Sequence, residues 1–136
     1  MSEKSDAFRI DEDSKPYTHL NFKNDPDDFQ FAIISDNAGG VRSGVLKAAL
    51  RMVNLLQPEF VTCLGDLVEG YNAPNGEQAD EDMYRTWWNE LDDFLAQLDM
   101  PFFFLPGNHD LNNPASVKVW RERHGGSRAY YHFIYK

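Results

Sequence analysis

The chain has 136 residues, of which 42% are hydrophobic and 14% aromatic, enough to bury the core of one globular domain. Its formal net charge of −9 argues against a nucleic-acid backbone or an anionic membrane as the main partner, because both are bound through basic surfaces. The single cysteine, Cys63, cannot form an internal disulfide, and neither a signal peptide nor an apolar run of ~18 residues is visible. By default we therefore expect a soluble, cytoplasmic protein.

The first half of the chain predicts a tail, two strands and a helix. Residues 1–16 are largely polar and are expected to form a tail ahead of one domain over residues 17–136. An alternating pattern predicts a short edge strand over residues 17–22, and a nearly continuous apolar run predicts a central strand over residues 29–35. Apolar residues at helical spacing predict a helix over residues 44–57.

The second half continues this alternation of strands and helices. The patterns predict a strand over residues 60–64, a helix over 79–98, a strand over 100–105, a helix over 113–124 and an aromatic strand over 130–135. Strands that alternate with helices are typical of a parallel sheet with right-handed crossovers. We therefore expect an α/β fold with a βαβαβ core.

Polar side chains follow three of the predicted strands. Ser35-Asp36 ends the first central strand, Gly65-Asp66 the second, and Gly107-Asn108-His109-Asp110 the third. Because ligands bind beyond the carboxyl ends of the strands in open sheets of this kind, we expect one shared site. Asp36 and Asp66 are hard oxygen donors suited to Mg²⁺, Mn²⁺ or iron and acceptable to Zn²⁺, and Asn108 offers a neutral carboxamide oxygen.

His109 and Asp110 add proton-transfer chemistry, and we take both as candidate catalytic residues. The imidazole of His109 can donate a proton or stabilise charge on a transferring phosphoryl group. The carboxylate of Asp110 can hold the tautomer of that imidazole and raise its basicity. Taken singly, Asp36 and Asp66 also suit helix or turn caps, but beside the Gly-Asn-His-Asp block we favour metal ligation.

The three blocks, in this order and spacing, resemble the first three motifs of the calcineurin-like metallophosphoesterases. The resemblance implies two divalent metal ions (Mn, Fe, Zn or Mg), with Asp36 on one ion, Asp66 bridging both and Asn108 on the second. It implies that His109 assists the leaving group and that the substrate is a phosphate ester. It also implies a β-sandwich with flanking helices, an αββα fold, of which this chain carries the N-terminal βαβαβ part.

The chain departs from that family pattern in two ways. The first motif is usually Asp-x-His, but Asp36-Asn37-Ala38 places a methyl group where the second metal ligand is expected. The later motifs, a separate His and then a Gly-His-x-His block, do not occur before Lys136. We expect either a fragment or a shortened member of the family.

Two functions therefore stay open. The first is metal-dependent hydrolysis of phosphate esters, and the second is a catalytically inactive domain that binds metal or phosphate or acts through protein contacts. Ala38 and the missing ligands favour the second function, whereas the Gly-Asn-His-Asp block favours the first. A half-domain would leave the apolar face of its sheet and the strand over residues 130–135 uncovered, so we also expect self-association.

Overall fold

The computed structural model describes residues 8–10, 13, 15–23, 25–126 and 129–135. Within these residues the helices are α1 (Val45–Leu56), α2 (Glu81–Leu95) and α3 (Pro114–His124). The strands in the same residues are β1 (Phe8–Ile10), β2 (Phe31–Ile34), β3 (Phe60–Cys63), β4 (Phe102–Phe103) and β5 (Phe133–Tyr135). This combination confirms the predicted α/β class. In the described part of the chain, no helix has the length and apolarity needed to cross a bilayer.

A parallel sheet positions the strand-end motifs. Its strands are ordered β2-β3-β4, with Phe31 paired to Phe60 and Val61 paired to Phe102 in parallel register. Along the chain α1 lies between β2 and β3, and α2 lies between β3 and β4, so the predicted βαβαβ order is confirmed. Because the three strands run the same way, their carboxyl ends meet at one edge of the sheet.

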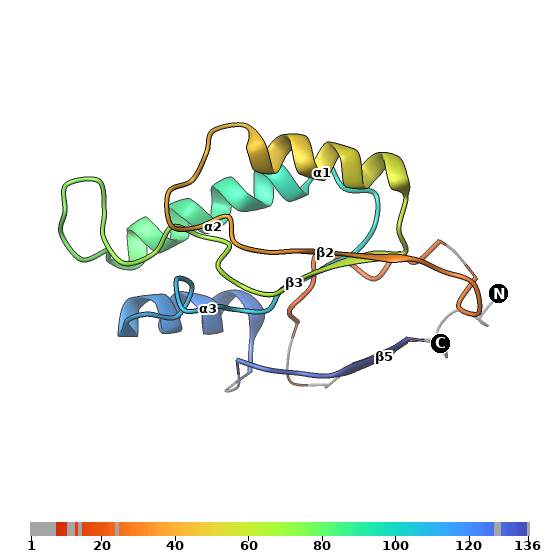
Figure 1. Ribbon diagram of the computed structural model, residues 1–136. Helices are drawn as coiled ribbons and strands as arrows, with labels where there is room; N and C mark the ends of the chain where they lie inside the picture. The colour runs from red at the N-terminus through yellow and green to blue at the C-terminus, as the bar shows by residue number, and fades with distance from the viewer. Residues whose placement is uncertain (1–7, 11–12, 14, 24, 127–128, 136) are drawn as a thin grey trace.

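Helices cover one face of this sheet, and β5 lies on the other side. Figure 1 shows α1 and α2 above the sheet and β5 below it, while α3 packs against α2. Leu50 of α1 and Trp88 and Leu91 of α2 are at most 3% exposed, and they form the core together with Val61 of the sheet. The apolar stripe of α2 therefore faces the core, as in an amphipathic helix, whereas on α1 only Leu50 is buried and the apolar residues Val45, Met52 and Leu56 are exposed.

Local side-chain chemistry determines where α2 and α3 start. The carboxylate of Asp80 accepts a hydrogen bond of 2.9 Å from the Met83 amide in the first turn of α2. Asn113 and Ser116 form a reciprocal capping box at α3, where Pro114 occupies the first turn. These caps satisfy amide groups that the first turn of a helix leaves without an internal partner. The start of α3 therefore agrees with the start predicted from Asn113-Pro114.

The face of the sheet opposite the helices carries an aromatic layer. β1 and β5 pair in antiparallel fashion, with Phe8 opposite Tyr135. The ring of Phe103 in β4 stacks on Phe133 in β5, with centroids 4.6 Å apart and planes inclined by 17°. Phe8 joins the layer at 5.6 Å from each of these two rings. Contacts between aromatic rings therefore hold β1 and β5, near the two ends of the described chain, against the parallel sheet.

Three expectations change at these strands. β1 lies within residues 1–16, which we expected to form a polar tail. It pairs with β5, a strand far away in the sequence, so no local sequence pattern predicts it. The edge strand predicted over residues 17–22 reduces to a single bridge, from Tyr17 to Phe103. The strand predicted over residues 130–135 shortens to β5, and its Phe133 packs on the sheet instead of lying uncovered.

A buried histidine joins α3 to α2 and to the end of β4. His124 is 5% exposed, and its ring centroid lies 4.2 Å from that of Trp120, 4.6 Å from Phe104 and 5.6 Å from Trp88. Burial, together with the neighbouring positive charge of Arg123, lowers the pKa of His124 to about 3. The imidazole is therefore neutral at pH 7.

This neutral histidine should make stability fall on acidification. In the unfolded chain the pKa of His124 returns to its ordinary value of 6.5, so below that pH the unfolded state takes up a proton that the folded state does not. We expect the free energy of unfolding to decrease as the pH falls from about 6.5 toward 3, by at most about 1.4 kcal/mol per pH unit from this group. Urea unfolding of the wild type and of His124→Phe across this range measures the effect, because phenylalanine keeps a ring but binds no proton. Identical pH dependence in the two proteins would contradict the prediction.

Candidate functional site

Two aspartates at the ends of β2 and β3 adopt a backbone conformation that is uncommon for residues with a side chain. Asp36 has a φ of 58° and Asp66 a φ of 56°, both in the left-handed region. The two turns bond to each other, because the Asp36 amide donates to the Gly65 carbonyl at 3.3 Å and the Ala38 amide donates to the Asp66 carbonyl at 3.0 Å. Such conformations persist only where neighbouring groups hold them, and they concentrate at functional sites.

The turn that follows β4 lies directly on the Asp66 turn. The His109 amide donates a hydrogen bond of 2.9 Å to Asp66 Oδ1. A Cβ atom at Gly107 would lie 2.2 Å from that same oxygen, and a Cβ atom at Gly65 would lie 2.4 Å from the Gly107 nitrogen. Only residues without a side chain allow this approach, which explains the glycines that precede Asp66 and Asn108.

The carboxylate of Asp110 joins these two turns from inside the protein. The residue is fully buried, and one of its oxygens accepts from the amides of Asp66 at 2.7 Å and Gly107 at 2.8 Å. The other oxygen accepts from the amides of Leu67 at 3.0 Å and Val68 at 3.1 Å. Burial raises the pKa of this carboxyl, and the four amide bonds act against the increase. Both oxygens thus bond the backbone, and Asp110 supports the loops.

A backbone carbonyl orients the imidazole of His109. Nδ1 of the ring is hydrogen-bonded to the carbonyl oxygen of Glu69. Because a carbonyl only accepts, Nδ1 carries the proton, and Nε2 is the nitrogen left for a ligand. A Cβ atom at Gly39 would lie 3.9 Å from Nε2, so this nitrogen faces the loop that follows Asp36. The tautomer-holding role that we expected of Asp110 is therefore performed by the Glu69 carbonyl.

Glu69 and Tyr71 are site residues that the motifs did not indicate. The Glu69 carboxylate accepts from the amide of Gly40 at 3.2 Å, which fixes the loop beside His109. The Tyr71 ring stands edge-on to the imidazole of His109 at 4.8 Å, and its hydroxyl accepts from the Asn108 side-chain amide at 3.1 Å. Both residues lie in the loop after Asp66, and their place in that loop was the only available signal.

A cavity of about 320 Å³ lies beside Asp36. It is lined by Asp36, Asn37, Ala38, Gly39, Gly40, Arg42 and Val45. Arg42 and Asp36 supply one positive and one negative charge to this lining, and the Arg42 guanidinium is the group in it that can bind an anion. The side-chain amide of Asn37 donates to the Leu67 carbonyl at 3.0 Å, so its nitrogen ties this loop to the Asp66 turn.

The three predicted metal ligands stand at the same sheet edge, with Asp36 and Asn108 exposed and Asp66 half-buried. One oxygen of Asp66 accepts from the His109 amide, and the Asn108 amide nitrogen donates to Tyr71. Oxygen donors of this kind match the chemistry of a hard divalent ion, but they make up only part of the six or so ligands that such an ion takes. Among the described residues, no three or more His, Cys, Asp or Glu side chains are arranged to hold a metal ion, and Ala38 offers no donor.

A comparison with known protein families agrees with this geometry. The model of the family described as calcineurin-like phosphoesterase matches residues 29–135, from just before β2 to the last residue of β5. The chain belongs to the calcineurin-like phosphoesterase family. A search of curated proteins and a search of solved structures each found no match. In this phosphoesterase domain all three motif blocks of the sequence fall within the matched residues.

The loops of this phosphoesterase domain should depend on Asp110 for stability. In Asp110→Asn, the NH2 of the carboxamide replaces one oxygen and faces backbone amides that are also donors. We therefore expect a loss of about 2 kcal/mol in the free energy of unfolding. Asp36→Asn is the matched control, because Asp36 is exposed and asparagine tolerates a positive φ; its change should stay within about 0.5 kcal/mol. Urea unfolding of both variants measures the difference. A loss of equal size in the two variants would show that Asp110 does not brace the loops.

Proposed function

We propose that this chain hydrolyses phosphate esters in a metal-dependent reaction. The observation that carries the proposal is the bonding between the three strand-end turns. The Asp66 turn is bonded to the Asp36 turn through the Ala38 amide and to the third turn through the His109 amide. These bonds bring two carboxylates, a carboxamide and an imidazole to one sheet edge, and the family match supports the reaction class.

In this proposal Asp36, Asp66 and Asn108 would hold the divalent cations, either Mn, Fe, Zn or Mg, that the family implies. A bound divalent cation supplies positive charge that offsets the charge of a phosphate group. Arg42 lines the adjoining cavity and adds a cationic neighbour for the same phosphate. Groups other than these three side chains would have to supply the remaining ligands of the cations.

His109 is proposed to protonate the leaving group. The Glu69 carbonyl accepts from Nδ1 and thereby fixes the ring with Nε2 toward the Asp36 loop. In the doubly protonated ring, Nε2 carries the proton that an alkoxide or phenoxide leaving group needs. Tyr71 restricts the ring from its side, because its own ring stands edge-on to the imidazole.

The role of His109 can be tested with two leaving groups. For His109→Gln we expect turnover with Mn²⁺ to fall on the order of 100-fold with phenyl phosphate, and by less with 4-nitrophenyl phosphate, whose leaving group needs no proton. Loss of kcat with little change in KM is expected, because the proton is needed in the transition state. His19→Gln is the matched control, since His19 lines a different cavity, and it should keep wild-type rates. Equal losses with the two esters would contradict an acid role for His109.

The enzyme proposal itself depends on Asp66. Asp66→Ala should abolish saturable turnover while the chain remains folded by circular dichroism. A folded wild type with no turnover in Mn²⁺, Zn²⁺, Fe²⁺ or Mg²⁺ would refute the proposal for this chain. It would favour the alternative, a catalytically inactive member of the family that acts in metal or phosphate binding or in protein contacts. Ala38 and the partial donor set are the observations that support this alternative.

We also propose self-association, on grounds that differ from the sequence expectation. β5 packs on the sheet, but β2 lies at the edge of the described parallel sheet and exposes Phe31 and Ile33 by 52% and 54%. On α1, Leu55 and Leu56 are 78% and 77% exposed. An edge strand flanked by apolar side chains can pair with a second copy of itself across a two-fold axis.

Light scattering at micromolar concentration should therefore report a dimer or a larger species. Ile33→Lys and Leu55→Lys place charges on the apolar surface and should shift the protein toward the monomer. Leu20→Lys, at a position that is 38% exposed outside β2 and α1, should leave the mass unchanged. A wild-type monomer at these concentrations would contradict the proposal.

A further inference from the structure

The backbone of Tyr71 has an unfavourable conformation beside the candidate site. Its φ of 58° lies in the left-handed region, which residues with a bulky side chain rarely adopt. Among the described residues other than glycine, a positive φ occurs at Asp36, Gln57, Asp66 and Tyr71. Gln57 caps the end of α1, and the other three belong to the candidate site. An outlier of this kind at a site is a reason to ask what its side chain does there.

Buried polar groups hold the Tyr71 backbone from inside the protein. The Tyr71 amide donates to the hydroxyl of Tyr84 at 3.2 Å, and this hydroxyl donates to Asn112 Oδ1 at 2.9 Å. The side-chain amide of Asn112 donates in turn to the His109 carbonyl at 2.8 Å. Tyr84 is fully buried, so the three bonds form a fixed link from Tyr71 to the turn that carries His109.

The glycine before Tyr71 lets the same two loops touch. A Cβ atom at Gly70 would lie 2.2 Å from the His109 carbonyl oxygen and 2.9 Å from Asn112 Nδ2. Only a residue without a side chain allows this approach. The loop after Asp66 therefore lies against the third strand-end turn, and Tyr71 is the first residue of this loop that can place a side chain over that turn.

The side chain of Tyr71 contacts two of the proposed functional residues. Its hydroxyl accepts a hydrogen bond of 3.1 Å from Asn108 Nδ2, so the Asn108 atom left for a cation is Oδ1. Its ring stands at 83° to the imidazole of His109, with the ring centroids 4.8 Å apart. One side chain therefore restrains both the carboxamide and the imidazole.

A role in stability alone does not account for this residue. The Tyr71 side chain is 45% exposed, so much of its ring stays in water and adds little to the core. Glycine or asparagine would adopt the backbone conformation with less strain. Neither of them would reach Asn108 and His109 with a hydroxyl group and a ring. The contacts with these two residues are what tyrosine supplies at this position.

We propose that Tyr71 is a positioning residue for the phosphoesterase reaction, an inference that rests on the proposed function. Its hydroxyl holds the Asn108 carboxamide so that Oδ1 stays available to a cation. Its ring keeps the His109 imidazole in the orientation that the Glu69 carbonyl sets. Groups that bond to a metal ligand orient it for the ion, and their removal typically lowers metal affinity or activity by about 10–100-fold.

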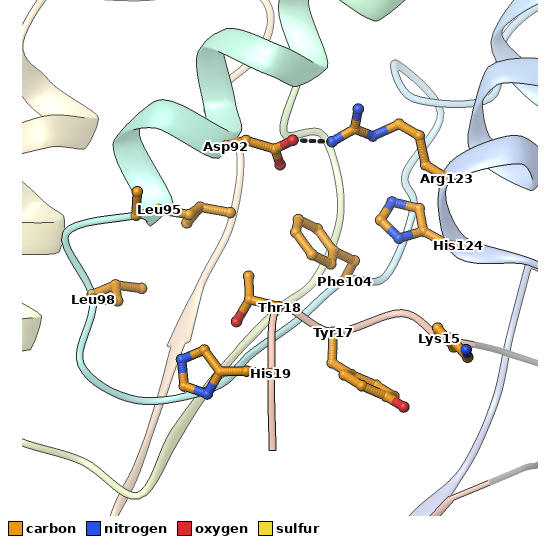
Figure 2. Close-up of a pocket in the computed structure, with 11 residues that line it drawn as sticks. Lys15, Tyr17, Thr18, His19, Asp92, Leu95, Leu98, Phe104, Arg123 and His124 are labelled. Atoms are coloured by element: carbon orange, nitrogen blue, oxygen red, sulfur yellow. Dashed lines mark hydrogen bonds and ion pairs between the residues drawn. The ribbon is translucent and has the colours of Figure 1, made fainter. Parts of the chain in front are cut away.

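The first test needs neither metal nor turnover. Tyr71→Phe removes the hydroxyl and keeps the ring, so NMR relaxation should show a more mobile Asn108 side-chain amide and little change at the His109 ring. Tyr17→Phe is the matched control. Figure 2 shows Tyr17 at a cavity lined from α2 and α3, and none of the strand-end motif residues lines this cavity. An equally rigid Asn108 amide in the wild type and Tyr71→Phe would overturn the proposal, whether or not the chain hydrolyses phosphate esters.

The second test measures the binding of Mn²⁺ alone by electron paramagnetic resonance. We expect Tyr71→Phe to bind Mn²⁺ about tenfold more weakly than the wild type, and Tyr17→Phe to bind it equally well. Equal affinity in the wild type and Tyr71→Phe would overturn the role of Tyr71 and leave the proposed hydrolysis standing. A folded wild type that binds no Mn²⁺ would overturn both.

Tyr71→Asn separates positioning from stability. Asparagine tolerates a positive φ but reaches neither Asn108 nor the ring of His109. We expect this variant to unfold at the same urea concentration as the wild type or a higher one, to bind Mn²⁺ as weakly as Tyr71→Phe, and to lose the ring-current shift at His109. A clearly lower unfolding midpoint with unchanged Mn²⁺ affinity would show that Tyr71 only stabilises the loop, and it would overturn the proposal.

Discussion

The carboxylate of Asp110 and its four backbone hydrogen bonds hold the candidate site together. Burying a charge is costly unless it is fully hydrogen-bonded, and an ionised carboxylate is the side chain that can accept from four amide donors at once. The donors come from the turns after two different strands: Asp66, Leu67 and Val68 after β3, and Gly107 after β4. This one group therefore sets the distance between the two turns. The bonds from Ala38 and His109 to Asp66, which carry the proposed function, depend on that spacing.

The division of roles at the site follows from this use of Asp110. Both oxygens of the Asp110 carboxylate accept hydrogen bonds from backbone amides. The His109 ring is therefore oriented by the main-chain carbonyl of Glu69 instead. The side chain of the same residue accepts from the Gly40 amide, so Glu69 links the imidazole to the loop where Ala38 departs from the family pattern. A carbonyl oxygen can only accept, so Nδ1 is the nitrogen that carries the proton in this contact. The acid chemistry that we propose requires only that Nε2 be free to act.

His109 and His124 show that one residue type has different roles in different surroundings of the same fold. His109 sits at the sheet edge with one nitrogen bonded to a carbonyl and the other near Gly39, in the loop that follows Asp36. His124 lies among Trp88, Phe104 and Trp120, where burial keeps the ring neutral. The first environment leaves a ring nitrogen for the acid role that we propose, whereas the second makes the imidazole a neutral part of the aromatic core. Both environments are made by segments that are distant in the sequence.

The amino-acid sequence by itself determined the order of the elements from β2 to α3, the family, and the positions of the carboxylates and the carboxamide at the strand ends. These features are local: an apolar run, the Asn113-Pro114 cap and the Gly-Asn-His-Asp block can each be recognised without knowing what lies opposite. Only the tertiary structure decided which groups those residues contact. It paired β1 with β5, turned Asp110 toward backbone amides of the Asp66 turn, and placed the Glu69 carbonyl against His109. The physical reason is that such bonds depend on strand register and turn geometry between distant segments, and no local pattern of side chains records which backbone groups will meet.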